Sequence, residues 1–139
     1  MMTLARRVAD KWASEAVALA PAKNDDLDAF EQEHGLAIPP LLRSIYLESN
    51  GTVDASVDLF HFWPIQEWTP PMAHVPKASE EEHIGMFVIA DYSLWAHAYA
   101  VCPSDGKVYL VGGVSPILVA PSTESFFRAY LDCPDDLFG

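Results

Sequence analysis

The spacing of apolar residues changes near Val57, and this change limits the fold more than any other feature of the chain. In the first twenty residues, apolar side chains recur every four positions, at Leu4, Val8, Trp12 and Ala16, which is typical of a helix with one apolar stripe. Beyond Val57 they gather in short β-rich runs, of which the clearest are VDLFHFWPI, MFVIA, WAHAYAV and KVYLVGG. Helices followed by strands predict an α+β domain with helices packed against one sheet.

Two further helices in the first half have recognisable ends. Asn24 or Asp25 is expected to cap the first of them, and Gly35 supplies the left-handed residue that ends it. Pro39 and Pro40 open the next helix, because a proline in the first turn removes no donor that the helix needs. The side chains expected to face the core from these helices are Leu27, Phe30, Leu42, Ile45 and Tyr46.

The remaining elements follow from local signals. The segment SDG, residues 104–106, predicts a tight turn that joins two runs in an antiparallel hairpin. A last helix starts near Ser122 and stops before Pro134. The first helix has only a modest stripe, so we expect it at the periphery. In total we expect about four helices packed with an antiparallel sheet of about five or six strands of mixed length.

The charge of the chain is strongly negative and unevenly placed. Residues 1–23 hold four basic and two acidic residues, whereas residues 24–139 hold four basic and eighteen acidic ones, and the formal net charge is -12. Such a surface repels phosphate backbones and anionic lipids, so direct binding to nucleic acid or to a membrane is not expected. It attracts basic partners and speeds their encounter. Acidity that serves only to keep the protein in solution is the alternative interpretation.

The sequence gives no sign of a disulfide framework or of a targeting segment. Cys102 and Cys133 lack the spacing of a zinc site and are interpreted as reduced thiols. Asp10, Lys11 and Glu15 interrupt any hydrophobic region near the N-terminus, and no apolar run has membrane-spanning length. These features favour a cytoplasmic location.

No catalytic or cofactor motif is present, so neither a catalytic residue, a metal site nor a cofactor is predicted. The GxSxG, GxxxxGK[ST], GxGxxG and HExxH patterns are absent. Neighbouring carboxylates, such as those at 25 and 26 or at 135 and 136, are interpreted as solvated faces. An enzyme would require a compact cleft that brings His97 or His61 close to Cys102 or Asp91.

Large aromatic side chains beside carboxylates are common anchors of protein interfaces. Trp63, Trp68 and Trp95 are therefore the aromatic candidates. We expect Trp63 to be buried within its strand. Trp68 precedes a proline-rich loop, and we expect it to be the more exposed of the two.

Several motifs follow one another in a recognisable order between residues 25 and 138. They are LDAFEQEHGLAIPPLLRSIYLESNG, LFHFWPIQEW, FVIADYSLWAHAYAVCPSDGKVYLVGG and SFFRAYL. This order resembles the SUKH superfamily, which includes the Smi/Knr-type fungal cell-wall regulators and many bacterial immunity proteins. The resemblance rests on Leu27, Phe30, Glu31, Gly35, Pro39, Tyr46, Asn50, Gly51, Phe62, Pro64, Ile65, Asp91, Tyr99, Gly106, Val108, Phe126 and Leu131. It implies a single SUKH-like domain over residues 25–139, with residues 1–24 as an N-terminal helical extension.

The resemblance also implies a non-enzymatic immunity protein that binds and neutralises a cognate bacterial toxin. Because nucleases need basic surfaces to hold phosphates, a nuclease is one toxin class that an acidic inhibitor suits. A SUKH-type regulatory or scaffolding module without a toxin partner is the alternative. In either case we expect a monomer or a weak homodimer. The expected partner contacts are Asp54, Asp58, Trp68, Glu80, Glu81, Glu82, Asp91 and Trp95.

Overall fold

The computed structural model describes residues 3–54, 59–73, 82–93, 97–112 and 115–138. In these ranges the α-helices are α1 (Leu4–Ser14), α2 (Asn24–His34), α3 (Pro40–Glu48) and α4 (Thr123–Asp132). The strands are β1 (Phe60–Phe62), β2 (Phe87–Tyr92), β3 (His97–Cys102), β4 (Lys107–Val111) and β5 (Ile117–Ala120). Short 3₁₀ helices are η1 (Ile65–Glu67), η2 (Pro71–Ala73) and η3 (Pro134–Leu137). The predicted α+β class is confirmed.

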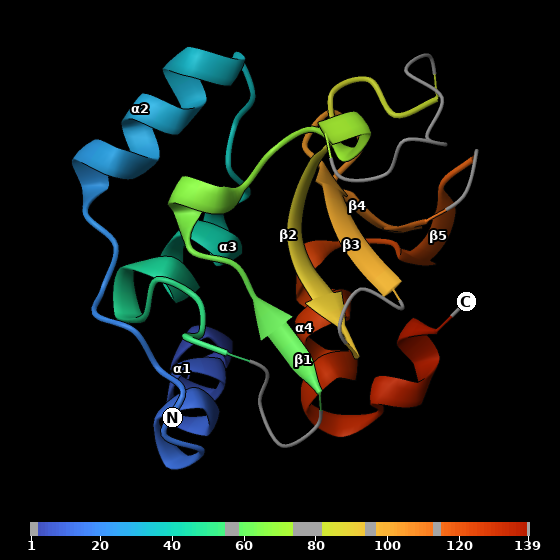
Figure 1. Ribbon diagram of the computed structural model, residues 1–139. Helices are drawn as coiled ribbons and strands as arrows, with labels where there is room; N and C mark the ends of the chain where they lie inside the picture. Colours follow the sequence, from blue (N-terminus) through green and yellow to red (C-terminus); the bar gives the residue numbers. More distant parts are fainter. Residues whose placement is uncertain (1–2, 55–58, 74–81, 94–96, 113–114, 139) are drawn as a thin grey trace.

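The strands form one antiparallel sheet in the order β1-β2-β3-β4-β5, so each strand pairs with the next along the chain. Figure 1 shows this sheet with α4 behind it and with α1 and α3 beside β1. The predicted hairpin is β3–β4, in which Gly106 takes the left-handed conformation, with φ 74°. The strand β5 has no counterpart among the runs that the sequence pattern singled out.

Alternation along β1 sends two phenylalanine rings to the side of the sheet that α4 covers. Phe60 and Phe62 lie 5.1 and 4.8 Å from the ring of Tyr130, measured between centroids. On the same side, Tyr99 of β3 lies 5.3 Å from Phe126 of α4. All five side chains are at most 1% exposed, so a dense aromatic layer joins α4 to the sheet.

The helix α1 belongs to the core, and its expected peripheral position is wrong. The side chain of Trp12 is fully buried, and its Nε1–H donates a hydrogen bond of 3.1 Å to the Tyr130 hydroxyl. Val8 is also fully buried, and α1 packs against both α3 and α4. A narrow stripe is enough here because the indole supplies much of the buried area. The division of the chain at residue 24 stays a prediction.

The ends of α2 and α3 follow the sequence signals closely. Gly35 ends α2 with φ 65°, as predicted. Asn24 is the first helical residue of α2, whereas Lys23 occupies the cap position without a side-chain hydrogen bond. The helix α3 begins at Pro40 and ends at Glu48. The side chains expected to be inward are all buried, namely Leu27, Phe30, Leu42, Ile45 and Tyr46.

Gly51 lies close to the backbone of Phe62 and Trp63, whereas Gly35 has open space around it. Comparing an alanine at each position therefore measures the effect of this close approach on stability. Both have positive φ, but a Cβ on Gly51 would lie 2.4 Å from the Phe62 carbonyl oxygen, whereas a Cβ on Gly35 would meet nothing within 4 Å. We expect Gly35→Ala to lower the free energy of unfolding by about 1–2 kcal/mol, because it only strains the backbone. We expect Gly51→Ala to lower it by more than about 3 kcal/mol. Urea unfolding of both variants measures this, and equal losses would contradict the close approach.

Candidate protein-binding groove

The expected partner contacts divide into exposed, buried and undescribed residues. Asp54 and Glu82 are exposed. Asp91 is only 4% exposed and Trp68 only 3%, so the expectation that they reach a partner directly is corrected. The other expected contacts lie outside the described residues: Asp58, Glu80, Glu81 and Trp95. Trp63 is 3% exposed, which confirms its predicted burial.

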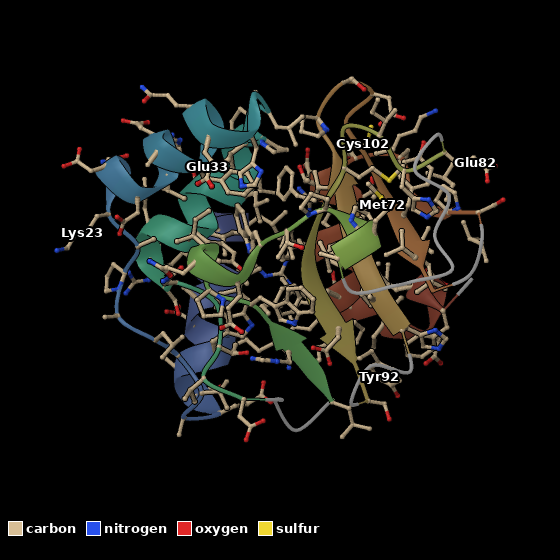
Figure 2. All side chains as sticks on the ribbon, turned by 45° about the horizontal axis from the view of Figure 1, so that its top comes forward. Lys23, Glu33, Met72, Glu82, Tyr92 and Cys102 are labelled. Atoms are coloured by element: carbon tan, nitrogen blue, oxygen red, sulfur yellow. The ribbon has the colours of Figure 1, made fainter. Side chains whose placement is uncertain are left out.

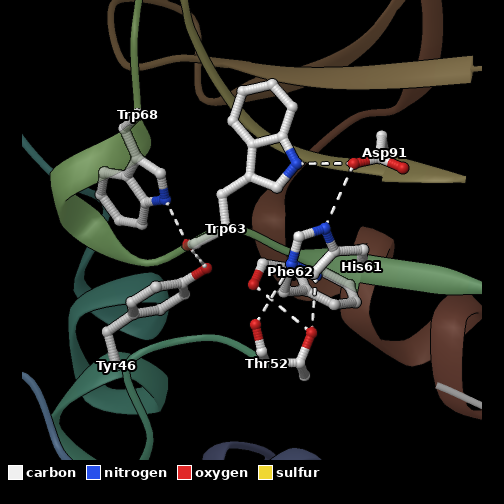
Figure 3. A network of polar contacts seen from close by, with 7 residues as sticks. All are labelled: Tyr46, Thr52, His61, Phe62, Trp63, Trp68 and Asp91. Carbon is white, nitrogen blue, oxygen red and sulfur yellow. Dashed lines mark hydrogen bonds and ion pairs between the residues drawn. The ribbon is translucent and has the colours of Figure 1, made fainter. Parts of the chain in front are cut away.

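Trp68 is buried because η1 turns its side chain inward. The indole stacks on Phe87 of β2 at 5.1 Å and meets the edge of Tyr46 of α3 at 4.7 Å. Its Nε1–H donates a hydrogen bond of 2.9 Å to the carbonyl of Trp63, which also accepts one of 2.7 Å from the Tyr46 hydroxyl (Figure 3). Burial raises the pKa of the Tyr46 hydroxyl, so it stays a neutral donor. Trp68 is therefore part of the core beneath η1 and is not an exposed contact residue.

Asp91 is buried because it joins two strands through a polar network. The β1–β2 register places His61 opposite Asp91, and His61 Nδ1 lies 3.4 Å from the carboxylate Oδ2. The same oxygen accepts a hydrogen bond of 2.7 Å from Trp63 Nε1–H, and His61 Nε2 lies 3.2 Å from the Thr52 carbonyl oxygen (Figure 3). Both acceptors facing the imidazole lack protons, so the doubly protonated ring satisfies both. The hydrogen bond with Asp91 accordingly raises the pKa of His61, although burial opposes it.

An enzyme was expected to need a cleft that brings a histidine close to Asp91 or Cys102. His61 does lie close to Asp91, but the pair does not lie in an accessible cleft. The two groups are adjacent, but Trp63 occupies the same carboxylate oxygen and Asp91 has almost no access to solvent. His97 instead stacks on Tyr92 and Phe138. Across the described ranges, no three His, Cys, Asp or Glu side chains gather closely enough to hold a metal ion. The arrangement supports a structural role for this network.

A groove of about 380 Å³ opens between α2 and η1. Its floor and sides combine apolar and acidic side chains, and it is lined by Asp26, Ala29, Phe30, Glu33, His34, Ile65, Gln66, Trp68 and Thr69. Phe30, Ile65 and Trp68 are buried, whereas Asp26 and Glu33 are exposed on α2. We call this feature the α2–η1 groove. It offers a partner an apolar floor between two carboxylates.

Two sides of α2 differ in how their carboxylates are paired. Arg43 of α3 donates hydrogen bonds of 2.7 Å to Asp28 and 3.1 Å to Glu31. On the groove side, no basic side chain of the described residues forms an ion pair with Asp26 or Glu33. The negative charge that faces the groove is therefore left for an external cation.

Sequence reasoning missed the groove, although one signal for it was present. Asp26 and Glu33 are seven residues apart, and on an α-helix this spacing returns to the same face after nearly two turns. The opposite wall comes from Ile65 to Thr69, more than thirty residues further on. The packing of Phe30 against Trp68, 5.4 Å between ring centroids, brings the two walls together.

Comparisons with known proteins identify one family. The SMI1 / KNR4 family (SUKH-1) matches residues 21–129, which include the groove, the sheet and most of α4. A search of curated proteins found no match. None of the helices in the described ranges combines the length and the apolar character needed to span a lipid bilayer.

The polar network makes a prediction about pH. A pKa raised by folding means that His61 contributes stability below its unfolded pKa of about 6.5 and loses that contribution as the pH rises through the folded value. The native chain should therefore be more stable relative to His61→Gln at about pH 5.5 than at about pH 9. Urea unfolding at both pH values measures the difference, and Asp91→Asn should remove most of it. A difference that does not change with pH would contradict the assignment.

Proposed function

The chain belongs to the SMI1/KNR4 (SUKH-1) family, and from this membership we propose that it is an immunity protein that binds and neutralises a basic toxin. The family is one of non-catalytic proteins and includes the immunity proteins of polymorphic toxin systems. In this proposal the chain acts by occupying the surface that the toxin needs for its own substrate. The family match over residues 21–129 is the observation that carries the proposal.

The charge of the chain supports a basic partner. Residues 24–139 hold eighteen acidic residues against four basic ones. Complementary charge speeds the encounter of two proteins and orients them as they approach. A nuclease toxin fits this picture, because the cations that hold its phosphate substrate would be satisfied by carboxylates of the inhibitor.

The proposed steering surface consists of carboxylates in and beside the segments 54–58 and 80–82. Asp54 and Glu82 are exposed, and Glu82 accepts a hydrogen bond of 2.7 Å from the Ser115 hydroxyl. Asp58, Glu80 and Glu81 extend this set in the sequence. Trp95 remains the proposed aromatic contact, whereas Trp68 and Asp91 act from beneath the surface.

Co-expression tests the function directly. Expression of the toxin-like product of the adjacent gene should stop growth, and the native chain should restore it and co-purify with that product. Catalytically inactive toxin is the control, because it should still form the complex without affecting growth. Killing that continues unchanged in the presence of the folded native chain would reject the proposal.

Association kinetics test the steering surface. Replacing Glu80, Glu81 and Glu82 by glutamine should lower the association rate constant for the toxin and flatten its dependence on ionic strength, because long-range attraction is screened by salt. Stopped-flow fluorescence at low and at physiological salt measures both quantities. Identical rate constants for the native and glutamine forms at low salt would remove these positions from the proposal.

A further inference from the structure

We propose that the α2–η1 groove receives a basic segment of the toxin, with two cationic side chains on Asp26 and Glu33 and an apolar side chain over the floor between them. The partner is taken from the proposed function, so the inference rests on it. Figure 2 shows Glu33 on α2 and Glu82 on opposite sides of the molecule. The groove is thus a second surface, separate from the steering carboxylate at Glu82.

The spacing of the two carboxylates sets the number of cations. Seven residues along an α-helix correspond to about 10.5 Å, which is too far for one guanidinium to contact both carboxylates. In a polyproline II segment, which has three residues per turn and rises about 3.1 Å per residue, side chains three positions apart lie on the same face about 9.3 Å apart. A segment with basic residues three positions apart therefore presents its charges at the separation between Asp26 and Glu33. A single metal ion or a single small cation would leave one of the two carboxylates without a counter-charge.

The size and floor of the groove favour side chains of a peptide. A volume of about 380 Å³ lies near the lower end of the range of about 300–1,000 Å³ that is usual for ligand sites. Phe30, Ile65 and Trp68 give the floor its apolar character. An apolar side chain, together with the aliphatic stem of a neighbouring arginine, removes this floor from water while the charged ends stay at the rim.

The floor is already rigid before a partner arrives. Trp68 Nε1–H is held by the Trp63 carbonyl at 2.9 Å. The backbone N–H of Ile65 donates a hydrogen bond of 2.8 Å to Asn50 Oδ1, and Asn50 Nδ2–H donates one of 3.0 Å to Gln66 Oε1. Binding therefore loses little conformational entropy on this side of the interface.

Charge complementarity selects a basic toxin segment over the other occupants. A phosphate or an acidic peptide would meet the same sign of charge on Asp26 and Glu33. A second copy of this chain would bring an excess of acidic side chains to an acidic groove. Arginine suits the rim because its planar fork binds a carboxylate with two hydrogen bonds.

A peptide experiment tests the groove without the toxin. The probe is the capped peptide GRLGRG, in which the arginines are three positions apart, and its control has both arginines replaced by the neutral isostere citrulline. In NMR titrations of the native chain, the arginine peptide should shift the Ala29 and Thr69 amides and the Trp68 indole N–H in a saturable way. The citrulline peptide should bind at least roughly tenfold more weakly. Equal binding of both peptides, or shifts confined to other surfaces, would overturn the inference.

A pair of variants then tests the groove with the toxin. Asp26→Asn combined with Glu33→Gln removes the groove charge, whereas Asp25→Asn combined with Asp136→Asn removes the same charge elsewhere. Asp25 shares the first turn of α2 with Asp26 but does not line the groove, so the loss of charge at the positive end of the helix is matched. The groove variant should dissociate from the toxin roughly tenfold faster than the native chain, and the control variant should not.

The outcomes separate the two proposals. Native chain that binds the toxin, together with a groove variant that dissociates at the native rate, overturns the groove and leaves the immunity function intact. Native chain that fails to bind the toxin rejects the function, and the peptide titration alone then decides the groove. If the groove and control variants both dissociate from the toxin equally faster than the native chain, the effect is a general one of charge, and the groove proposal is overturned. Stable dimers of the native chain that the groove variant abolishes would assign the groove to a second copy instead.

Discussion

The carbonyl group of Trp63 joins the parts of the molecule that position the α2–η1 groove. It accepts hydrogen bonds from the Tyr46 hydroxyl at 2.7 Å and from Trp68 Nε1–H at 2.9 Å, so α3 and the residues that directly follow β1 and η1 meet at one acceptor. All three groups are buried, where water cannot replace a lost bond and an unpaired donor costs about 1–3 kcal/mol. Gly51 is required beside it, since a Cβ there would lie 2.9 Å from the same carbonyl oxygen. The position of the groove floor is a consequence of this junction.

On the helix α2, the residues that attach it to the core differ from those proposed to bind a partner. Its inner face is attached through Phe30, which meets Trp68 at 5.4 Å and Phe87 at 5.0 Å. Its carboxylates would repel one another without a counter-charge, and Arg43 supplies one to Asp28 and Glu31. Apolar packing and the ion pairs of Arg43 therefore attach the helix, whereas the carboxylates on the groove side form no ion pair with another described residue.

Local sequence signals predicted the elements well, whereas their packing depended on contacts between distant residues. Gly35, Pro40 and Ser122 mark helix ends through backbone chemistry that acts over a few residues, and each marks an end in the structure. Burial of Trp12 depends on Tyr130, which is 118 residues away, so the stripe on α1 could not reveal it. Trp68 was expected at the surface because prolines follow it, but the turn of η1 directs it inward. The short edge strand β5, with its first two residues exposed, lacks the alternation that marks a half-buried strand.

Acidity alone does not distinguish a binding protein from one that is merely kept in solution, so the proposal of a binding groove rests on where the carboxylates lie. Solubility is served by carboxylates that are fully solvated and spread over a convex surface. Asp26 and Glu33 instead flank a hollow with an apolar floor. A floor fixed by the Trp63 junction, and rim carboxylates that form no ion pair with another described residue, are both features that solubility does not require. They are the features expected of a surface that holds a basic protein segment.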